Sequence, residues 1–323
     1  MNPRPVVIAH RGASGYLPEH TAEAKALAHA MGADYLEQDV VATRDAQLLV
    51  MHDIFLDAVT DVAAVFPGRA RSDGRHYAVD FELAEIRTLN VVERRRAGTG
   101  ERLFPERFRA AAPRFGLATL AEELELIQDL NRTTGREAGI YPEVKEPQWH
   151  HEHGIDLAKL VLGELDAYGY RTSDGRAYVQ CFDAAELERM RRELKTELPL
   201  VQLLPASDRP PAAARLPAGA AEYAAGAGIP FEWLVSLERG RVGASPLLAS
   251  MRRAGLAVHA YTLRRERVPA WAGSFENLLA CFFAELRVDG VFCDHPDIAV
   301  RVRNSLDSQQ HSSDGQPPET GLE

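Results

Sequence analysis

Hydrophobic residues along this chain gather in short runs that are separated by stretches of helical periodicity. Most runs are apolar throughout and do not alternate with polar residues, which is typical of strands covered on both faces. The sequence therefore favours a sheet that is enclosed by helices. Nine runs have the length of a strand: 6–10, 35–41, 48–52, 139–145, 178–182, 198–204, 231–237, 256–263 and 288–293.

Helical patterns fall between these runs, over 21–31, 119–131, 183–194 and 245–253. The first ends before Gly32, which suits a helix C-cap, and the second opens with Thr119 and Glu122 in capping-box spacing. A strand followed by a helix recurs about eight times over roughly 300 residues. This rhythm predicts an α/β fold of the (β/α)8 type, a TIM barrel, with a doubly wound parallel sheet as the alternative.

One connection breaks the rhythm. Only residues 42–47 separate the second and third runs, which is too short for a crossover helix, so these strands should form an antiparallel hairpin. With the turn near Asp45, Asp39 should lie beside His52, to within a residue or two. Residues 54–115, with a helix candidate at 82–89, are interpreted as an insertion over the barrel mouth. The barrel domain would span 1–304, and the polar segment 305–323 is predicted to be a disordered tail.

The composition and net charge of the chain disfavour some classes of function. The 323 residues are 46% hydrophobic and 26% charged, with a formal net charge of −10. Such an acidic chain is a poor candidate for binding nucleic acid or an anionic membrane, so an anionic substrate would need positive charge supplied locally. The three cysteines, in strand-like contexts, are expected to be buried thiols.

The chain has no apolar run long enough for a transmembrane helix and no signal peptide. The expected location is therefore cytoplasmic as the sequence stands, or periplasmic if the sequence is a trimmed mature form. The oligomeric state is not readable, with a homodimer as one option.

Polar residues end several of the predicted strands, which is where a barrel builds its active site. His10 and Arg11 follow the first strand, and Gly12 allows a sharp turn there. Glu37 and Asp39 end the second strand, and because they are two residues apart they should face the same side. Two converging carboxylates need a cation between them, and oxygen ligands favour Ca²⁺ or Mg²⁺. Taken alone, each motif also fits a solvated strand end or separate ion pairs.

Further strand ends repeat the pattern. Glu143 and Lys145 share one face of a later strand, so Glu143 could complete a three-carboxylate metal site and Lys145 could bind a carboxylate or a phosphate. His52 ends the hairpin and could exchange protons there together with His10. Glu19 could orient His10 or Arg11. Residues proposed to line a substrate pocket are Trp149, His150, His151, Gln180, Cys181, Phe182 and Tyr261.

The set as a whole suits hydrolysis of a phosphodiester. Two histidines could act as acid and base, Arg11 and Lys145 could bind an anion, and three carboxylates could hold a divalent cation. Such a reaction requires charge on the phosphoryl oxygens to be neutralised and a leaving alkoxide to be protonated.

The segments HRGASGYLPEHT, ADYLEQDV, VMHD, YPEVK and VQCFDA, taken in order and spacing, resemble the glycerophosphodiester phosphodiesterase family. The resemblance extends from Val6 to about Arg303, and the insertion is similar to that of the larger bacterial, periplasmic-type members. It implies a TIM barrel that cleaves glycerophosphodiesters to sn-glycerol 3-phosphate and an alcohol. It also implies that the glycerol 2-hydroxyl attacks phosphorus to give a cyclic phosphate, which water then opens.

The resemblance assigns roles to individual residues. The family's catalytic histidines match His10 and His52. Its metal carboxylates, which hold Ca²⁺ or Mg²⁺, match Glu37, Asp39 and Glu143, and Ca²⁺ is the ion favoured here. Arg11 and Lys145 match its substrate-contacting cations, and Glu19, Gln180, Phe182 and Tyr261 join them as expected substrate-binding residues.

Three alternatives stay open from the sequence. The first is a related barrel phosphodiesterase that acts on intact phospholipid, although no apolar membrane-facing surface is evident and stable membrane association is not expected. The second is a binding protein that keeps the barrel without turnover, although both histidines are present. The third is a metal-dependent isomerase on the same fold, which would not need Arg11 beside two histidines.

Overall fold

The structure is a computed structural model that describes residues 4–110, 114–172, 176–206, 219–238 and 241–314. Eight parallel strands close into a barrel, because β1 pairs both with β11 and with β2. This closure confirms the predicted (β/α)8 fold and excludes the doubly wound sheet. The barrel strands are β1 (Val6–Ala9), β2 (Tyr35–Ala42), β4 (Gly139–Val144), β5 (Val179–Cys181), β6 (Leu200–Leu203), β7 (Gly226–Pro230), β10 (Ala257–Leu263) and β11 (Gly290–Cys293).

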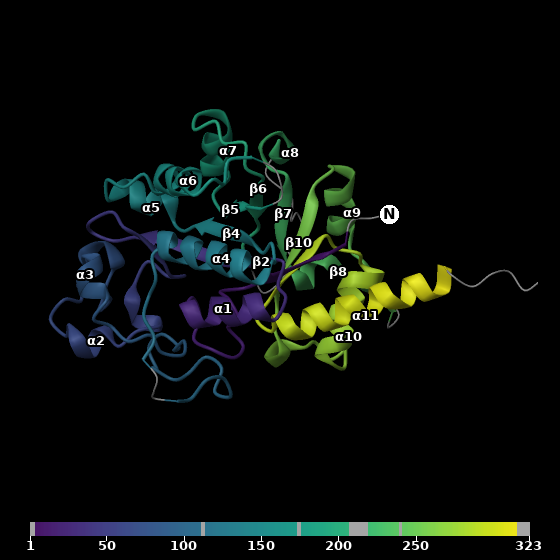
Figure 1. Cartoon of the computed structure of the whole chain (residues 1–323), viewed down its shortest axis with the longest axis horizontal. Coiled ribbons are helices and arrows are strands. Elements are labelled where there is room, and N and C mark those ends of the chain that lie inside the picture. Colours follow the sequence, from purple (N-terminus) through teal and green to yellow (C-terminus); the bar gives the residue numbers. More distant parts are fainter. Residues whose placement is uncertain (1–3, 111–113, 173–175, 207–218, 239–240, 315–323) are drawn as a thin grey trace, which may run out of the picture.

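Helices surround the barrel (Figure 1) and turn their apolar sides toward it. In α4, Leu120, Leu124 and Ile127 follow helical spacing and are fully buried. Thr119 and Glu122 form the predicted capping box at its start. None of the helices in the described ranges has the length and apolar character needed to cross a bilayer. The helices are α1 (Ala22–Ala30), α4 (Leu120–Thr134), α5 (Pro147–Glu152), α6 (Leu157–Ala167), α7 (Ala184–Arg192), α8 (Ala220–Tyr223), α9 (Pro246–Arg253), α10 (Phe275–Ala280) and α11 (Pro296–Asp314), and a π-helical turn (Cys281–Glu285) follows α10.

The predicted hairpin is present. Strand β3 (Leu48–Val50) runs antiparallel to β2 with Val40 opposite Val50. The backbone N–H of Met51 donates to the carbonyl of Asp39 at 2.8 Å, so the register is shifted by one residue from the expected pairing, within its stated margin. His52 follows directly, and the hairpin brings it to the end of the strand that carries Asp39.

The insertion has a small hydrophobic core of its own that packs onto the hairpin through Val41 and Leu49. It contains the helices α2 (Val62–Val65) and α3 (Leu83–Ile86) and the 3-10 turns Leu56–Ala58 and Ala78–Asp80. Helix α3 confirms the helix candidate in a shortened form, with Glu82 as its N-cap. In Figure 1 this segment, in blue, lies beside the barrel next to β2 and α4.

One predicted barrel strand is wrong. Residues 231–237 form a 3-10 turn (Phe231–Leu234) and the start of β8 (Val235–Glu238), which pairs with β9 (Arg241–Ala244) outside the barrel. The barrel strand is β7, whose sequence GAGIP carries almost no strand signal. A Cβ on Gly228 would lie 2.3 Å from Leu203 Cδ2, and one on Gly226 would lie 2.9 Å from the Ala257 carbonyl oxygen. The neighbouring backbone thus leaves space only for glycine at Gly226, and at Gly228 a larger residue would displace the Leu203 side chain. The two glycines remove the hydrophobic pattern of a strand.

The predicted start of the C-terminal tail is also wrong. Helix α11 continues past Ser305 to Asp314. Two contacts anchor the continued helix, because Leu306 packs on the core and Arg4 Nε donates to Asp307 Oδ2 at 3.0 Å. Residues 315–323 lie outside the described part of the chain. The three cysteines are buried free thiols, as expected.

Aromatic rings fill part of the barrel interior. Tyr35, Tyr141 and Phe292 pack there together with Ile8 and Val201. His259 joins them from β10, with its Nδ1 2.7 Å from the Tyr141 hydroxyl, within hydrogen-bond distance. Burial alone lowers the pKa of His259 to about 4, because the apolar surroundings disfavour the charged ring. This histidine therefore stays neutral in the folded protein at pH values where a solvated histidine is charged.

The His259 pKa predicts how stability depends on pH. The unfolded chain binds a proton at this ring below about pH 6.5, whereas the folded chain does so only near pH 4. The stabilisation is therefore complete above pH 6.5 and is lost as the pH falls toward 4. Lowering the pH from 7 to 5 should reduce the unfolding free energy of both proteins. The reduction should be about 2 kcal/mol smaller in His259→Gln than in the wild type, because the variant lacks this ring.

Denaturant unfolding monitored by circular dichroism at the two pH values measures this difference. The matched control is His153→Gln, because His153 is exposed on the turn after α5. It should keep the wild-type pH dependence. Equal pH dependence in the wild type and in His259→Gln would contradict the assignment.

Candidate functional site

The loop after β1 turns sharply at the barrel mouth. Arg11 and Gly12 both have positive φ values, of 59° and 81°. A Cβ on Gly12 would lie 2.8 Å from the carbonyl carbon of Ala24 in the facing helix, so this position requires glycine. Because of this turn the Arg11 backbone N–H points at Glu37 and donates to its Oε2 at 2.8 Å. The loop thereby fixes Arg11 and His10 against strand β2.

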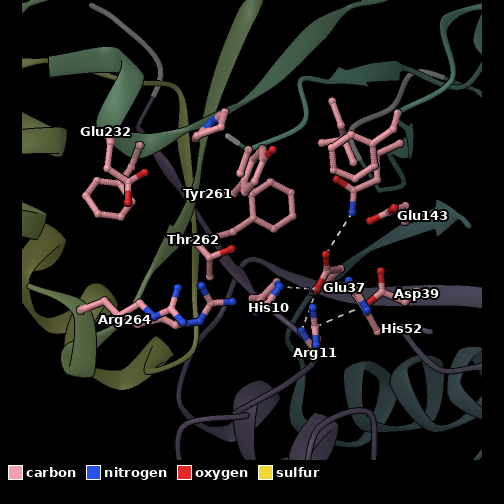
Figure 2. A pocket seen from close by; sticks show the side chains of 18 residues that line it. His10, Arg11, Glu37, Asp39, His52, Glu143, Glu232, Tyr261, Thr262 and Arg264 are labelled. Atoms are coloured by element: carbon pink, nitrogen blue, oxygen red, sulfur yellow. Dashed lines mark hydrogen bonds and ion pairs between the residues drawn. The ribbon is translucent and has the colours of Figure 1, made fainter. Parts of the chain in front are cut away.

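Three carboxylates converge at the ends of adjacent strands. Asp39 on β2 lies opposite Glu143 on β4, and Glu37 is two residues before Asp39 on the same face. All three are almost fully buried, and one oxygen of each lies within 4.8 Å of the others. Figure 2 shows them together on one side of a cavity. The structure thus brings together the predicted metal-ligand set.

The charges of these carboxylates are only partly balanced. Lys145 Nζ donates to Glu143 Oε1 at 2.7 Å and lies 3.6 Å from Asp39 Oδ1. Burial and the neighbouring Asp39 raise the pKa of Glu37 well above its usual value. Although burial opposes it, Lys145 and His52 hold the pKa of Asp39 well below its usual range. The Arg11 guanidinium also lies beside Asp39, with Nε 3.4 Å from Oδ2. Three carboxylates with two cationic side chains in a buried space favour a further cation.

Two buried oxygens support this fit. Asp39 Oδ1 and Gln180 Oε1 have no hydrogen-bond donor among the described residues. Gln180 uses its amide to donate to Glu37 Oε1 at 3.1 Å, so its carbonyl oxygen remains beside the cluster. Glu37, Asp39 and Glu143 are therefore the residues that could hold a divalent ion, with oxygen ligands of the kind that Ca²⁺ and Mg²⁺ accept.

A second group with metal-ligand spacing lies elsewhere, at His151, Asp156 and Glu186. Arg189 forms ion pairs there with Asp156 at 2.5 Å and with Glu186 at 2.8 Å. The guanidinium already occupies the position of a cation. This group is best explained as an ion-pair network between helices.

His10 is held by a carboxylate from the last strand. Its Nδ1 lies 2.7 Å from Asp294 Oδ1, directly after β11, and its Nε2 lies 3.9 Å from Glu37 Oε2. Burial, together with the nearby Arg11, lowers the pKa of His10 to about 4, although Asp294 opposes this shift. Burial would raise the pKa of Asp294, but Arg264 and His10 hold it well below its usual range. A charged Asp294 thus orients the His10 ring toward the carboxylates.

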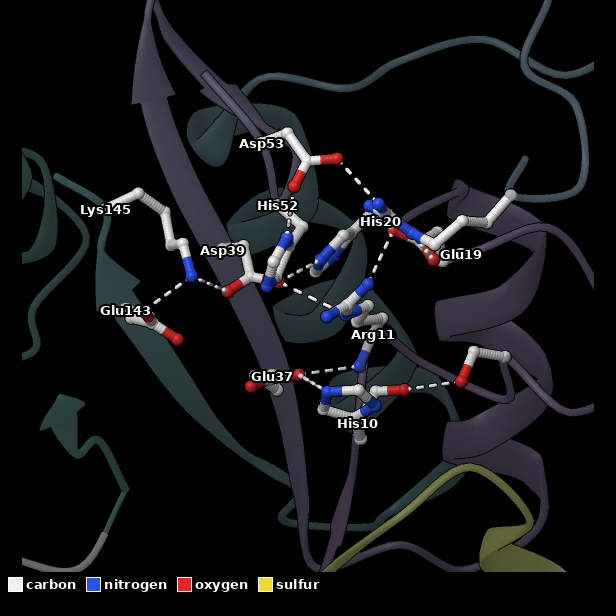
Figure 3. Close-up of polar contacts among 12 residues, drawn as sticks. His10, Arg11, Glu19, His20, Glu37, Asp39, His52, Asp53, Glu143 and Lys145 are labelled. Carbon is white, nitrogen blue, oxygen red and sulfur yellow. Dashed lines mark hydrogen bonds and ion pairs between the residues drawn. The ribbon is translucent and has the colours of Figure 1, made fainter. Parts of the chain in front are cut away.

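His52 has a similar arrangement on the other side of Arg11 (Figure 3). Its Nδ1 lies 2.6 Å from Asp53 Oδ1, and Arg94 from the insertion donates to Asp53 Oδ2 at 2.6 Å. Arg94 also donates to Glu19, which in turn accepts from Arg11 Nη1 at 2.9 Å. Burial, followed by the Arg11 charge, lowers the pKa of His52 to about 4. The insertion therefore helps to position a residue at the barrel mouth.

These side chains open onto a cavity of about 220 Å³, here named the carboxylate cavity. It brings together most of the predicted site residues. Those lining it are His10, Arg11, Glu37, Asp39, His52, Glu143, Gln180, Phe182 and Tyr261.

The remaining predicted site residues lie around or away from this cavity. Lys145 is held against Glu143 and Asp39, and Glu19 is held between Arg11 and Arg94, so both support lining residues. Residues 149–151, which were expected to line a pocket, are not among the lining residues of this cavity, and Trp149 stacks on Tyr77 of the insertion. His150 is buried, and its Nε2 accepts from the backbone of β2. Cys181 is buried behind the strand, where its thiol contacts the Val144 carbonyl.

Sequence reasoning missed several residues that the fold adds. His20 Nε2 lies 2.8 Å from Asp39 Oδ2, and Arg264 Nε donates to Asp294 Oδ2 at 2.8 Å. Asp294 could have been found, because it directly follows the last predicted strand and so satisfies the strand-end criterion. Arg94 could not have been found in this way, because it lies in an irregular part of the insertion.

Comparison with known proteins identifies the family. The model of the "Glycerophosphoryl diester phosphodiesterase family" matches residues 10–298. The chain belongs to this family. This membership confirms the family predicted from the strand-end motifs, and it confirms the prediction that the chain is an enzyme.

Curated relatives match the chain over most of its length. A glycerophosphodiester phosphodiesterase of Haemophilus influenzae is 38% identical over 93% of this chain and 90% of its own length. A glycerophosphodiester phosphodiesterase of Treponema pallidum is 36% identical over 92% of this chain and 91% of its own length. The matched segments thus span nine-tenths or more of this chain and of both relatives.

Solved structures share the barrel. A Silicibacter pomeroyi protein superposes with a TM-score of 0.70 at 25% identity, covering 94% of this chain and 95% of that one. An Oleispira antarctica phosphodiesterase, solved in complex with the product sn-glycerol-3-phosphate, superposes with a TM-score of 0.63 at 21% identity, covering 93% and 97%. These likenesses support the fold.

A buried ion pair supports the strand that carries Glu37 and Asp39. Lys25 of α1 and Glu123 of α4 are both fully buried, and Lys25 Nζ donates to Glu123 Oε2 at 2.6 Å. Lys25 Nζ also donates to the backbone carbonyl of Glu37. The pair therefore joins two helices to the site strand, although neither residue lines the carboxylate cavity.

This pair gives a stability prediction. Lys25→Met leaves the Glu123 carboxylate buried without its partner, so unfolding free energy should fall by about 3–5 kcal/mol. The double variant Lys25→Met/Glu123→Leu should recover most of that loss, because it removes both buried charges. Chemical denaturation measures both changes.

The matched control is Arg132→Met, which breaks an exposed pair with Asp129 on the same helix. It should change stability by no more than about 0.5 kcal/mol. A Lys25→Met variant as stable as this control would show that the buried pair does not contribute to stability.

Proposed function

We propose that the chain hydrolyses glycerophosphodiesters to sn-glycerol 3-phosphate and an alcohol, with a divalent cation held by Glu37, Asp39 and Glu143. The observation that carries this proposal is the carboxylate cavity, onto which two histidines, Arg11 and the three carboxylates all open. The curated relatives at 36–38% identity are named glycerophosphodiester phosphodiesterases, which supports the substrate class. Ca²⁺ is the proposed ion, with Mg²⁺ as the alternative.

The charges at the site have distinct tasks. The cation, when bound, would neutralise negative charge on the phosphoryl oxygens. Arg11 offers a guanidinium whose orientation is fixed by Glu19 and by Asp39, whose Oδ2 lies 3.4 Å from Arg11 Nε. Lys145 keeps Glu143 and Asp39 in place and is held beside them as a cation, because those two carboxylates raise its pKa despite burial.

The histidines supply the proton transfers in this proposal. Asp294 and Asp53 each engage the Nδ1 of one histidine, which leaves Nε2 of each ring for the substrate. One ring removes the proton from the glycerol 2-hydroxyl, which attacks phosphorus to give a cyclic phosphate. The other ring donates a proton to the alkoxide that leaves. In the second half of the reaction water attacks the cyclic phosphate, and the two rings exchange roles.

The size and walls of the carboxylate cavity favour a small substrate. A volume of about 220 Å³ suits a glycerol phosphate group, not a long acyl chain. Phe182 and Tyr261 meet edge to face with ring centroids 6.4 Å apart, and they offer apolar surface to the carbon skeleton of glycerol. These features favour deacylated diesters over intact phospholipid.

The metal requirement is directly testable. Purified protein should release glycerol 3-phosphate from glycerophosphocholine, measured by a coupled dehydrogenase assay, and should release none from micellar phosphatidylcholine. Treatment with EDTA should abolish release, and added Ca²⁺ or Mg²⁺ should restore it. Ca²⁺ should also raise the melting temperature, because only the folded chain presents the complete site.

A matched pair of variants tests the location of the ion. Glu143→Gln should lose both the restored activity and the thermal shift. Glu186→Gln should retain both responses, because it alters the other acidic group, which Arg189 already balances. Full activity after metal removal would contradict the catalytic use of the three carboxylates.

The histidine roles give a second prediction. His10→Ala and His52→Ala should each lower kcat by at least about 100-fold, because each removes a group that transfers a proton. Circular dichroism should show an unchanged fold. His153→Ala, at an exposed histidine outside the cavity lining, is the matched control and should retain wild-type kcat. Either cavity variant turning over at the control rate would contradict the assigned role.

A further inference from the structure

A second cavity, of about 240 Å³, adjoins the carboxylate cavity. The two share His10, Arg11 and His52 as lining residues, together with Arg264 and Arg267. The second cavity does not touch Glu37, Asp39 or Glu143. The carboxylate cluster therefore lines only the first cavity, and the two cavities adjoin at His10, Arg11 and His52, the residues to which the proposed function assigns proton transfer and phosphate binding.

The walls of this second cavity are strongly cationic, and we name it the arginine cavity. The insertion supplies Arg94 and Arg107, and Arg11, Arg264 and Arg267 come from the barrel loops. Glu19 and Asp294 are the carboxylates that line it. Positive charge thus outweighs negative charge in this cavity, although the chain as a whole carries −10.

Four of the five guanidiniums are already paired. Arg11 and Arg94 bind Glu19, while Arg107 and Arg264 bind Asp294, at 2.7–2.9 Å. Their charges and geometries are therefore largely committed to the protein. They hold the cavity walls in place.

Arg267 differs from the other four. It is exposed, lies in the 3-10 turn η4 (Arg265–Arg267), and has no ion pair or side-chain hydrogen bond among the described residues. Its guanidinium carbon lies 5.7 Å from the centre of the Phe104 ring, and Arg107 lies 3.8 Å from the same ring. Phe104 of the insertion thus offers a face for Arg267, and the donors of Arg267 remain available to a ligand.

The geometry points to a binding site for the leaving alcohol: we propose that the arginine cavity receives this part of the diester and favours alcohols bearing a negatively charged group, which Arg267 binds. This inference rests on the proposed function. A phosphodiester has two substituents on phosphorus, and the protein has two cavities that meet at the histidines. Each substituent can therefore occupy one cavity.

Charge decides which substituent enters which cavity. The glycerol arm is neutral, so an excess of guanidinium charge gains little from it beyond ordinary hydrogen bonds. The alcohol arm is the one that can carry a carboxylate or a phosphate. The aromatic side chains Phe182 and Tyr261 belong to the carboxylate cavity, where they suit the neutral glycerol arm.

A matched pair of substrates tests this proposal. Glycerophosphoserine differs from glycerophosphoethanolamine by one added carboxylate on the alcohol. The wild type should hydrolyse the serine diester with a kcat/KM roughly three- to tenfold higher, as expected for one partly solvated charge-assisted contact. Arg267→Gln should bring this ratio to about one, mainly by raising KM for the serine diester.

A neighbouring arginine provides the control. Arg265 lies on the same 3-10 turn and is exposed, but it lines neither cavity. Arg265→Gln should therefore keep the wild-type preference. Both variants remove one positive charge, so a difference between them reports on position and not on net charge.

The outcomes separate this inference from the proposed function. Hydrolysis of both diesters with equal kcat/KM by the wild type would overturn the inference alone. So would an Arg267→Gln variant that slows both diesters equally, because Arg267 would then act on the shared phosphate. Failure to hydrolyse either diester with metal present would overturn the proposed function itself.

Discussion

Mutual repulsion among three buried carboxylates is the constraint on which the barrel mouth depends. Glu37, Asp39 and Glu143 cannot all be charged in this space without cations close by. Lys145 and Arg11 supply part of that charge from the protein, and the proposed divalent ion supplies the rest. The arginines farther out in turn require their own carboxylates. The site is thus built as alternating layers of charge, each of which fixes the orientation of the next.

Much of this arrangement could be predicted from the sequence, because it obeys local rules. Strand-end placement located His10 and Glu143, and the short connection after β2 correctly brought His52 to Asp39. These inferences needed only the periodicity of strands and the reach of a short loop. The barrel followed from the strand–helix rhythm, except at β7, where two glycines remove the pattern.

The residues that could not be predicted act through contacts that are distant in sequence. Arg94 reaches Asp53 and Glu19 from an irregular segment with no periodic signal. Lys25 reads as one polar position on an amphipathic helix, yet it is fully buried, because Glu123 from another helix meets it there. Such pairings depend on how elements dock, and a single sequence does not encode docking in any local pattern.

The contact between His10 and Asp294 spans 284 residues and joins the first barrel strand to the last. During synthesis, His10 lacks the Asp294 carboxylate that orients it until β11 and the residue after it have been translated. Barrel closure and completion of this histidine–carboxylate pair are therefore one event. A nascent or C-terminally truncated chain could bury much of its core and still lack an oriented His10, so turnover would report on the finished barrel.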